Sequence, residues 1–291
     1  MSAILETRKL CFTYQKDMPD EKRAVNDISV AFESGETVGI IGHTGSGKST
    51  FVQHLNGLLK PTSGQVLLGG QDIWQNKDRM REFRFRVGLV FQYPEYQLFE
   101  ETVYRDVAFG PRNMGLSTEE IDRRVRSAIA FTGLGESVLD RSPFDLSGGQ
   151  KRRVAIAGVL AMEPDVLVLD EPTSGLDPAG RRLMLDQIRD YHEKCGNTVL
   201  IVSHSMDDVA RYADRVMVIN EGGLFCYDET DRVFEQASTL EGMGLAIPTI
   251  TDIMLRLRER GVNLGSPVYT VDELVERIGQ ALPLRKGGGK G

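Results

Sequence analysis

Two kinds of hydrophobic pattern follow one another along the chain. Short apolar runs are typical of buried strands, and stretches with an apolar residue at every third or fourth position are typical of helices. Buried strands are expected at 36–41, 84–92, 166–169 and 198–203. Helices are expected at 51–59 and 179–193, and the region 102–162 has a helical pattern with short breaks. Strands that alternate with helices in this way predict an α/β fold.

The start of the chain has a different pattern, because its apolar positions alternate. Residues 3–14 and 24–33 are expected to form two strands joined by a polar loop that contains a proline. The first strand ends in an aromatic residue, Tyr14. Its ring could stack on a nucleobase, although an aromatic at the end of a strand is more often only a packing residue.

Composition narrows the class of protein. With 291 residues, 41% of them hydrophobic, the chain can bury a substantial core. A net charge of −7 argues against a broad nucleic-acid surface. Cys11, Cys195 and Cys226 are too scattered for a metal site or a disulfide framework, so reduced thiols are expected. No apolar run approaches the length of a membrane span, and we expect a protein that is soluble or peripheral to a membrane.

A glycine-rich loop, Gly42 to Ser49, follows the strand expected at 36–41 and matches a phosphate-binding P-loop. Its glycines let backbone N–H groups converge on an anion, and the helix that follows directs the positive end of its dipole to the same place. Lys48 would supply a point charge for the β- and γ-phosphates, and Ser49 is placed to bind Mg²⁺. The alternative is a glycine-rich turn that matches by accident.

A second anion site of the same kind is expected at Ser147. This residue is a good N-cap for the helix that follows, and Gly148 and Gly149 expose backbone N–H groups. A plain N-cap would not need two adjacent glycines, because each of them costs helix stability. The chain is therefore expected to carry two phosphate-binding helix ends.

Polar side chains follow three of the expected strands. Asp170 and Glu171 follow one strand, Gln92 ends another, and His204 follows a third. Ligands bind at the carboxyl ends of strands in a parallel sheet. Asp170 and Gln92 suit the coordination shell of Mg²⁺, and Glu171 could polarise an attacking water. A lone histidine is usually structural, but at this edge His204 is a candidate γ-phosphate sensor.

Together these residues resemble the ATP-binding cassette (ABC) ATPase family over residues 4–235. The matching motifs are Walker A at 42–49, the Q-loop at Gln92, the LSGGQ signature at 146–150, Walker B at 166–171, the D-loop at 174–177 and the switch histidine at His204. The sequences of the segments 91–99, 108–111 and 155–158 are most similar to those of the ATPases of energy-coupling factor (ECF) transporters, in particular to their second ATPase subunit.

The resemblance implies a fold and a set of site residues. The fold is the P-loop NTPase fold of ABC ATPases, with a RecA-like parallel core sheet, an antiparallel β subdomain and a helical signature subdomain. ATP and Mg²⁺ would be the cofactors, with Glu171 as general base and His204 on the γ-phosphate. The metal ligands would be Ser49, Gln92 and Asp170. The residues that would bind the nucleotide are Tyr14, Gly42, His43, Thr44, Gly45, Ser46, Gly47, Lys48, Ser49, Thr50, Gln92, Asp170, Ser147, Gly148, Gly149 and Gln150.

The resemblance also implies partners, because ABC domains work as head-to-tail pairs. A second ABC ATPase subunit, more specifically a heterodimer partner, would complete each ATP site with its signature helix. A transmembrane coupling (T) subunit and a membrane substrate-binding (S) subunit would hold the protein at the cytoplasmic face of the cell membrane as a peripheral membrane protein. Contacts with the coupling subunit are expected from Tyr93, Tyr96, Leu98 and Phe99; the alternative is that this apolar loop packs under the helix that follows it.

ATP hydrolysis would then drive uptake of vitamins or other micronutrients, and no nucleic-acid partner is expected. Two other transport roles stay open: the ATPase of a conventional ABC importer and that of a dedicated cobalt or nickel ECF transporter. A soluble ABC ATPase of DNA repair or translation is a further alternative. Those proteins resemble cassettes interrupted by coiled coils, zinc modules or a second cassette, and this sequence has no such pattern.

The ATPase motifs end well before the last residue. We expect a nucleotide-binding domain at 1–235, with its helical subdomain at about 100–162, and a C-terminal helical extension at 236–291. Two amphipathic helices, expected at 249–261 and 270–282, are too short to bury both apolar faces against each other. The resemblance implies that the extension joins the two ATPases.

Overall fold

A six-stranded sheet forms the centre of the computed structural model, which describes residues 3–262 and 264–281. The strands lie in the order β10, β9, β3, β8, β7, β6; only β10 is antiparallel to its neighbour. Their bounds are β3 (Thr37–Ile41), β6 (Val87–Val90), β7 (Val166–Asp170), β8 (Thr198–Val202), β9 (Arg215–Asn220) and β10 (Gly223–Glu229). β3, β6, β7 and β8 are buried along their whole length, because other elements cover both faces of the sheet.

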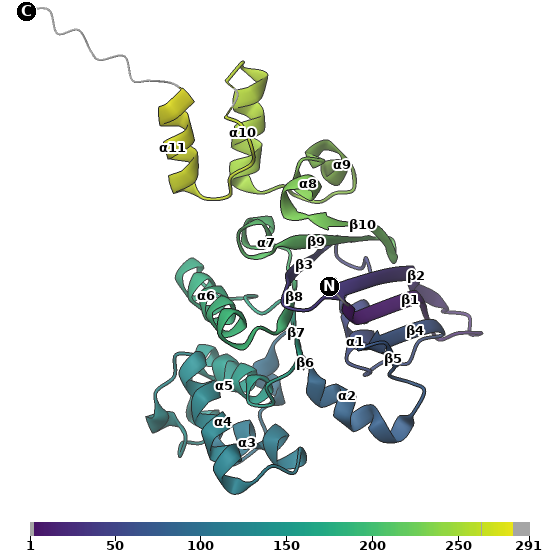
Figure 1. Ribbon diagram of the computed structural model, residues 1–291, viewed down its shortest axis with the longest axis vertical. Helices are drawn as coiled ribbons and strands as arrows, with labels where there is room; N and C mark the ends of the chain where they lie inside the picture. The colour runs from purple at the N-terminus through teal and green to yellow at the C-terminus, as the bar shows by residue number, and fades with distance from the viewer. Residues whose placement is uncertain (1–2, 263, 282–291) are drawn as a thin grey trace, which may run out of the picture.

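A second, antiparallel sheet has the strand order β2, β1, β4, β5. Its strands are β1 (Ala3–Tyr14), β2 (Lys22–Glu33), β4 (Ser63–Leu68) and β5 (Gln71–Asp72). Helix α1 (Lys48–Leu55) lies between the two sheets, and Phe51 of α1 shares one core with Phe32 of β2 and Ile40 of β3. Figure 1 shows α6 (Pro178–Cys195) on the opposite side of the central sheet. This arrangement confirms the predicted α/β fold with a parallel core and an antiparallel part.

The expected strand at 84–92 is wrong at its start. Residues Met80–Arg86 form helix α2, and the strand is only β6. The alternation of arginine and phenylalanine at 84–86 imitates a strand. The backbone stays helical because Met80 and Phe83, three residues apart, both pack into the core beside α1. The expected helix at 51–59 is also shorter, since Gly57 leaves the helical conformation with φ +69°.

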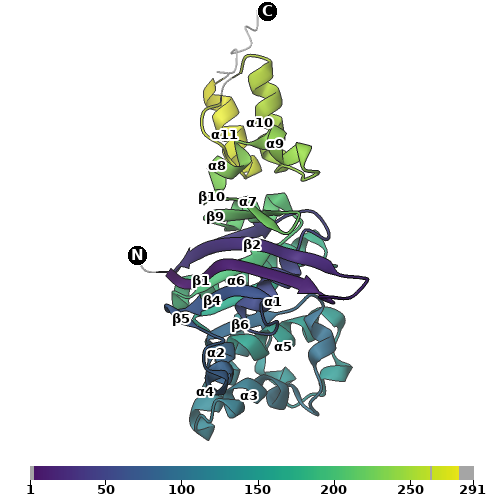
Figure 2. The ribbon, with the colours of Figure 1, turned by 90° about the vertical axis from the view of Figure 1, so that its right-hand side faces the viewer.

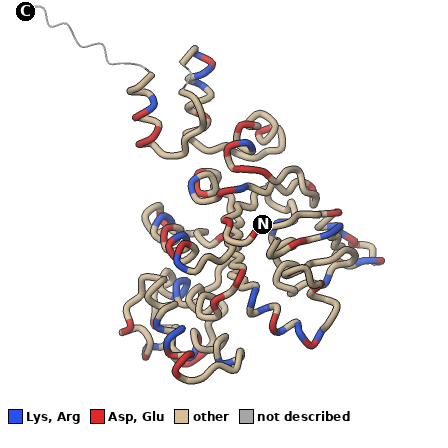
Figure 3. The backbone as a smooth tube through the Cα atoms, viewed as in Figure 1, with Lys and Arg blue, Asp and Glu red and all other residues tan. Residues whose placement is uncertain are grey.

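The remaining helices form two groups at opposite ends of the central sheet (Figure 1). One group shares a large apolar core with α6 and comprises α3 (Val103–Asn113), α4 (Thr118–Phe131) and α5 (Gly148–Leu160). Along this group arginines alternate with acidic side chains (Figure 3), and Arg124 forms an ion pair with Glu120. Short 3₁₀ turns are η1 (Lys77–Arg79), η2 (Pro94–Gln97), η3 (Glu136–Val138) and η4 (Pro143–Asp145).

The other group follows α7 (Met206–Tyr212) and stands above the sheets in Figure 2. It comprises α8 (Thr230–Phe234), α9 (Ala237–Gly242), α10 (Thr249–Glu259) and α11 (Val271–Ala281). Ile250 of α10 and Leu274 of α11 share a small core with residues of the connecting segment. Val271 and Val275 remain 64% and 63% exposed. Helix α11 therefore leaves apolar side chains uncovered.

Within the described residues, no helix combines the length and the hydropathy needed to cross a bilayer.

We predict that Leu200→Ala lowers the free energy of unfolding by about 2–5 kcal/mol, because it opens a cavity that tightly packed strands cannot fill. Leu200 lies in the middle of β8 and is 0% exposed. Urea denaturation measures the change. The control is Leu183→Ala on α6, where the side chain is 46% exposed and the cost is expected to stay within about 0.5 kcal/mol. Equal losses in the two variants would contradict this account of the core.

Candidate functional site at the carboxyl edge of the central sheet

A cavity of about 410 Å³ opens at the carboxyl ends of β3, β7 and β8. The side chains that follow these parallel strands meet there, as the chain direction requires. Its lining residues are Tyr14, Lys22, Ala24, Thr44, Gly45, Gly47, Lys48, Ser49, Thr50, Gln92, Asp170, Glu171, Val202 and His204. The structure therefore gathers residues separated by up to 190 positions in the sequence into one pocket.

The glycine-rich loop is shaped around the amine of Lys48. Gly47 has φ +104°, and a Cβ there would collide with the carbonyl oxygen of Ala24, so the position requires glycine. Helix α1 begins at Lys48, whose Nζ donates to the carbonyl oxygens of Gly42 at 2.7 Å and His43 at 3.0 Å. Burial lowers the pKa of Lys48, while the nearby carboxylates oppose this shift. The loop carbonyls thus hold the Lys48 ammonium group beside the cavity, where it can also bind an anion.

The other predicted loop residues have different contacts. Gly42 and His43 contribute carbonyls, as above, and do not line the cavity themselves. Ser46 is buried beneath the loop, and its N–H donates to the carbonyl of His43 at 3.1 Å. Thr50 Oγ1 lies 3.1 Å from the hydroxyl of Tyr14. This contact holds the half-exposed Tyr14 ring at the mouth of the pocket.

Two acidic residues face Lys48 from the end of β7. Burial raises the pKa of Asp170, and its Oδ1 is buried without a hydrogen-bond partner among the described residues. Burial and then the neighbouring Asp170 carboxylate raise the pKa of Glu171 to about 7. Glu171 has a left-handed backbone conformation with φ 52°, and its N–H donates to the carbonyl of Val202 at 3.0 Å. A carboxyl group with a pKa near neutrality is suited to accept a proton from water.

His204 lies beside this carboxyl group. Its Nε2 is 3.3 Å from Glu171 Oε1, and about half of the His204 side chain is exposed. Burial, followed by the charge of Lys48, lowers the pKa of His204. A mostly neutral imidazole can donate one hydrogen bond and accept another, as a group that holds both a water and a phosphate oxygen must.

The structure does not bring the predicted second anion site into this pocket. Ser147 caps α5 in a capping box: Gln150 N–H donates to Ser147 Oγ at 3.4 Å, and Ser147 N–H donates to Gln150 Oε1 at 3.1 Å. Apart from its chain neighbours and its own helix backbone, a Cβ added at Gly148 or Gly149 would meet no atom of the described residues within 4 Å. The N-terminus of α5 is therefore open to a ligand or partner at a place of its own.

Three lining residues are not among the predicted site residues: Lys22 and Ala24 on β2, and Val202 at the end of β8. Lys22 lies directly opposite Tyr14 in the antiparallel register, and Ala24 lies below the glycine loop. The expected strand began at residue 24, so Lys22 was assigned to a loop. The antiparallel pairing of β1 with β2 would have identified Lys22, because the residue opposite Tyr14 lies on the same side of the sheet.

Comparisons with known proteins agree with this geometry. The sequence profile of the ABC transporter family matches residues 25–174. The chain is 52% identical over 275 residues to the energy-coupling factor transporter ATP-binding protein EcfA2 of Clostridium perfringens, covering 94% of this chain and 96% of that protein. It is 53% identical over 274 residues to EcfA2 of Symbiobacterium thermophilum, covering 94% and 95%.

Solved structures give the same result. CbiO1 of Clostridium perfringens, described as part of the ABC transporter complex CbiONQ, is 39% identical and superposes with a TM-score of 0.74 over 88% of this chain and 100% of that one. A dimeric post-hydrolysis state of the ATP-binding cassette MJ0796 bound to ADP and phosphate is 27% identical, with a TM-score of 0.70 over 78% and 98%. By sequence and by structure, this chain belongs to the ABC transporter family, among the ATP-binding proteins of energy-coupling factor transporters.

Proposed function

We propose that the pocket binds ATP and hydrolyses it to drive uptake of a micronutrient across the cell membrane. The observation that carries the proposal is the buried ammonium of Lys48, which faces Asp170 and Glu171 across a cavity of about 410 Å³. A triphosphate entering this space would receive the ammonium and the N-terminus of α1 together. Tyr14, at the mouth, is placed to stack on the adenine ring.

The residues present fit a magnesium ion bound together with the nucleotide. Asp170 offers a buried oxygen without a hydrogen-bond partner among the described residues, and Ser49 and Gln92 line the same cavity with a hydroxyl and an amide. Oxygen donors of this kind suit Mg²⁺, which usually takes only one or two protein ligands and completes its shell with phosphates and water. When bound, the ion would neutralise charge on the phosphates.

In the proposed mechanism Glu171 acts as general base. Its carboxylate accepts a proton from the water that attacks the γ-phosphate, while His204 Nε2 holds that water or a γ-phosphate oxygen in place. Lys48 balances the negative charge of the phosphates throughout. Closure of the site against bulk water would have to come from a surface outside this pocket.

We propose that a second ATPase subunit supplies that surface. Ser147, Gly148 and Gly149 lie outside the pocket of their own chain and form an open helix end, which a phosphate of another subunit's ATP could reach. The similar cassette MJ0796 was solved as a dimer bound to ADP and phosphate. Whether the partner is a second copy or a related chain, the two open helix ends of one subunit would serve two different ATP molecules.

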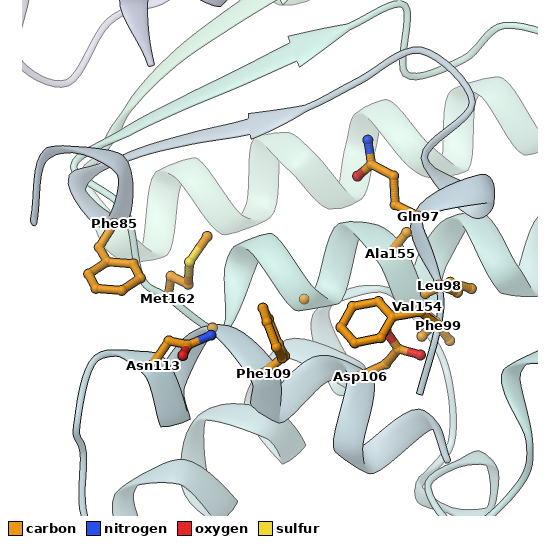
Figure 4. A pocket seen from close by; sticks show the side chains of 12 residues that line it. Phe85, Gln97, Leu98, Phe99, Asp106, Phe109, Asn113, Val154, Ala155 and Met162 are labelled. Carbon is orange, nitrogen blue, oxygen red and sulfur yellow. The ribbon is translucent and has the colours of Figure 1, made fainter. Parts of the chain in front are cut away.

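A membrane coupling subunit is proposed to dock in a groove of about 280 Å³ on the helical part (Figure 4). The rings of Phe99 and Phe109 stand edge to face there, 5.0 Å apart, and both are well exposed. Leu98, which was also expected at this contact, lines the groove. Tyr93 and Tyr96 do not line it, although Tyr96 is 85% exposed and directly precedes the lining residue Gln97 in the sequence. An apolar groove of this kind suits an inserted helix.

Docking of this kind would place the protein at the cytoplasmic face of the membrane as a peripheral subunit. A membrane substrate-binding subunit would choose the solute, with vitamins as the expected class. The relatives named for energy-coupling factor transporters favour this assembly over a conventional importer. The similar protein CbiO1 is described as part of a differently named transporter complex, CbiONQ, so a dedicated transporter stays the alternative assembly.

We also propose the division into a nucleotide-binding domain at 1–235 and a C-terminal extension at 236–291 that contacts the second ATPase. Val271 and Val275 support this role, because they form an exposed apolar face on α11. The extension is anchored to the body by Thr249, whose N–H donates to Asp207 Oδ1 at 2.7 Å, and by Tyr269, whose hydroxyl donates to Asp231 Oδ1 at 2.7 Å.

Glu171→Gln tests the catalytic role. The amide cannot accept the proton, so the hydrolysis rate of the assembled complex should fall by about 10²- to 10⁴-fold, which corresponds to about 3–5 kcal/mol of transition-state stabilisation. ATP affinity, measured with a fluorescent analogue, should change little. Equal hydrolysis by mutant and wild type would falsify the assignment of the base.

The docking groove is tested by replacing both Phe99 and Phe109 with alanine. Loss of two central aromatic anchors should weaken binding of the transmembrane coupling subunit by about 30-fold or more, because such anchors carry much of the energy of an interface. The measurement is recovery of that subunit with the tagged chain from detergent-solubilised membranes. Phe144→Ala is the control, since Phe144 is at least as exposed as Phe99 and Phe109 but does not line the groove.

The contact through α11 is tested with Val271→Ser and Val275→Ser combined. Removal of this apolar face should raise the dissociation constant of the nucleotide-free ATPase pair by about tenfold or more, as measured by analytical ultracentrifugation. Glu276→Ser, an exposed polar position on the same helix, should leave it unchanged. An unaltered dissociation constant in the valine variant would remove α11 from the contact.

A further inference from the structure

Arg152 of α5 joins three segments that are far apart in the sequence. Its side chain is almost completely buried, and its Nε and Nη2 donate to the two carboxylate oxygens of Glu95 at 3.1 and 3.0 Å. Its Nη1 donates to the carbonyl oxygen of Ser174. The guanidinium carbon lies 6.0 Å from the ring centre of Tyr93. The segment after Gln92, the helix capped by Ser147 and the turn after Glu171 therefore meet at one guanidinium group.

On one side this network leads to the candidate general base. Ser174 lies in the turn that follows Glu171, and its N–H donates to the carbonyl oxygen of Glu171 at 3.2 Å. Glu171 holds a left-handed backbone conformation, which is unfavourable for a residue with a side chain and persists only when its surroundings fix it. Arg152 donates a hydrogen bond to the carbonyl oxygen of Ser174. It therefore helps to fix the turn that sets the direction of the Glu171 side chain.

On the other side the network leads to the docking groove. Glu95 belongs to η2, which begins after Tyr93 in a left-handed conformation with φ 57°. The next residues along the chain, Gln97 to Phe99, form one wall of the groove, and Val154 and Ala155 of α5 form part of another (Figure 4). A helix inserted into this groove would press on the short turn that carries Glu95.

The chemistry of this junction requires arginine. The planar fork binds both oxygens of one carboxylate and still has a donor for a carbonyl on another segment. A lysine at this position would keep the charge but could not hold both partners in fixed directions. Gln92, the predicted magnesium ligand, lies only three residues before Glu95. A displacement of the η2 turn would therefore also move Gln92, which lines the ATP pocket proposed above.

We infer that Arg152 is a positioning residue that couples occupation of the docking groove to the placement of Glu171. The inference rests on the proposed function, because it needs a membrane subunit in the groove and ATP in the pocket. The groove fixes Glu95, Glu95 fixes Arg152, and Arg152 fixes the turn after Glu171. Hydrolysis is fast only when Glu95, Arg152 and the turn after Glu171 all hold these positions.

The experiment uses the complete complex in proteoliposomes and, in parallel, the ATPase pair without its membrane subunits. Three variants are compared: Arg152→Lys, Glu95→Gln, and the neutral double variant with Arg152→Met and Glu95→Gln. For each, kcat and KM for ATP, solute uptake per ATP hydrolysed, and the thermal unfolding midpoint are measured. Arg126→Lys is the control, since Arg126 forms exposed ion pairs with Asp122 and Glu136 on the same group of helices.

In the complex we expect kcat to fall by about 10-fold or more in each of the three variants, with KM for ATP within about twofold, because a misplaced base slows chemistry more than it weakens nucleotide binding. The fall should be smaller in the ATPase pair without membrane subunits. The double variant should be no worse than the single ones, as for residues that act in series. Arg126→Lys should match the wild type.

The double variant also separates positioning from plain stability. Replacing both members of a buried ion pair by uncharged side chains usually leaves stability nearly unchanged. If this variant has a wild-type unfolding midpoint and wild-type kcat, or if it is unfolded at the assay temperature, Arg152 is only a structural residue and the inference is overturned. Equal losses of kcat with and without the membrane subunits would overturn it too. If hydrolysis by the wild type does not depend on the membrane subunits, the proposed function itself fails.

Discussion

The buried charge of Lys48 is the constraint on which the site depends. An ammonium group in a protein interior needs partners, and the loop supplies two carbonyl oxygens while β7 brings two carboxylates to face it. Each of these partners is a consequence of parallel strands that end at the same edge. The proposed triphosphate would add phosphate oxygens to the partners of this ammonium group, and the central sheet places the loop and the two carboxylates on the same cavity.

A chain with two open helix ends cannot use both on one ligand when they lie on different parts of the structure. Helix α1 points into the pocket, whereas the N-terminus of α5 opens elsewhere, with free space around Gly148 and Gly149. In the proposed pair, ATP would lie between two subunits, and cleavage of its γ-phosphate would remove a contact between the two chains.

In the proposed assembly, Arg152 would link the ATP site to the docking groove. The same helix α5 carries the open N-terminus, the buried guanidinium and one wall of the docking groove. The bidentate contact with Glu95 ties the neighbouring turn to this helix. The groove, the turn after Glu171 and the helix end are thus connected through α5 and one guanidinium group.

Local sequence by itself determined the strand and helix types around the pocket, the glycine loop, the cap at Ser147 and the acidic pair after β7, because each depends on conformational preferences of neighbouring residues. Local pattern failed where packing decided: residues 84–86 alternate like a strand but continue α2, since Phe83 is anchored in the core. Lys22 and Arg152 could not be assigned from sequence either. Their roles depend on partners 8 and more residues away, which only the register of a hairpin and the packing of α5 against two loops bring within reach.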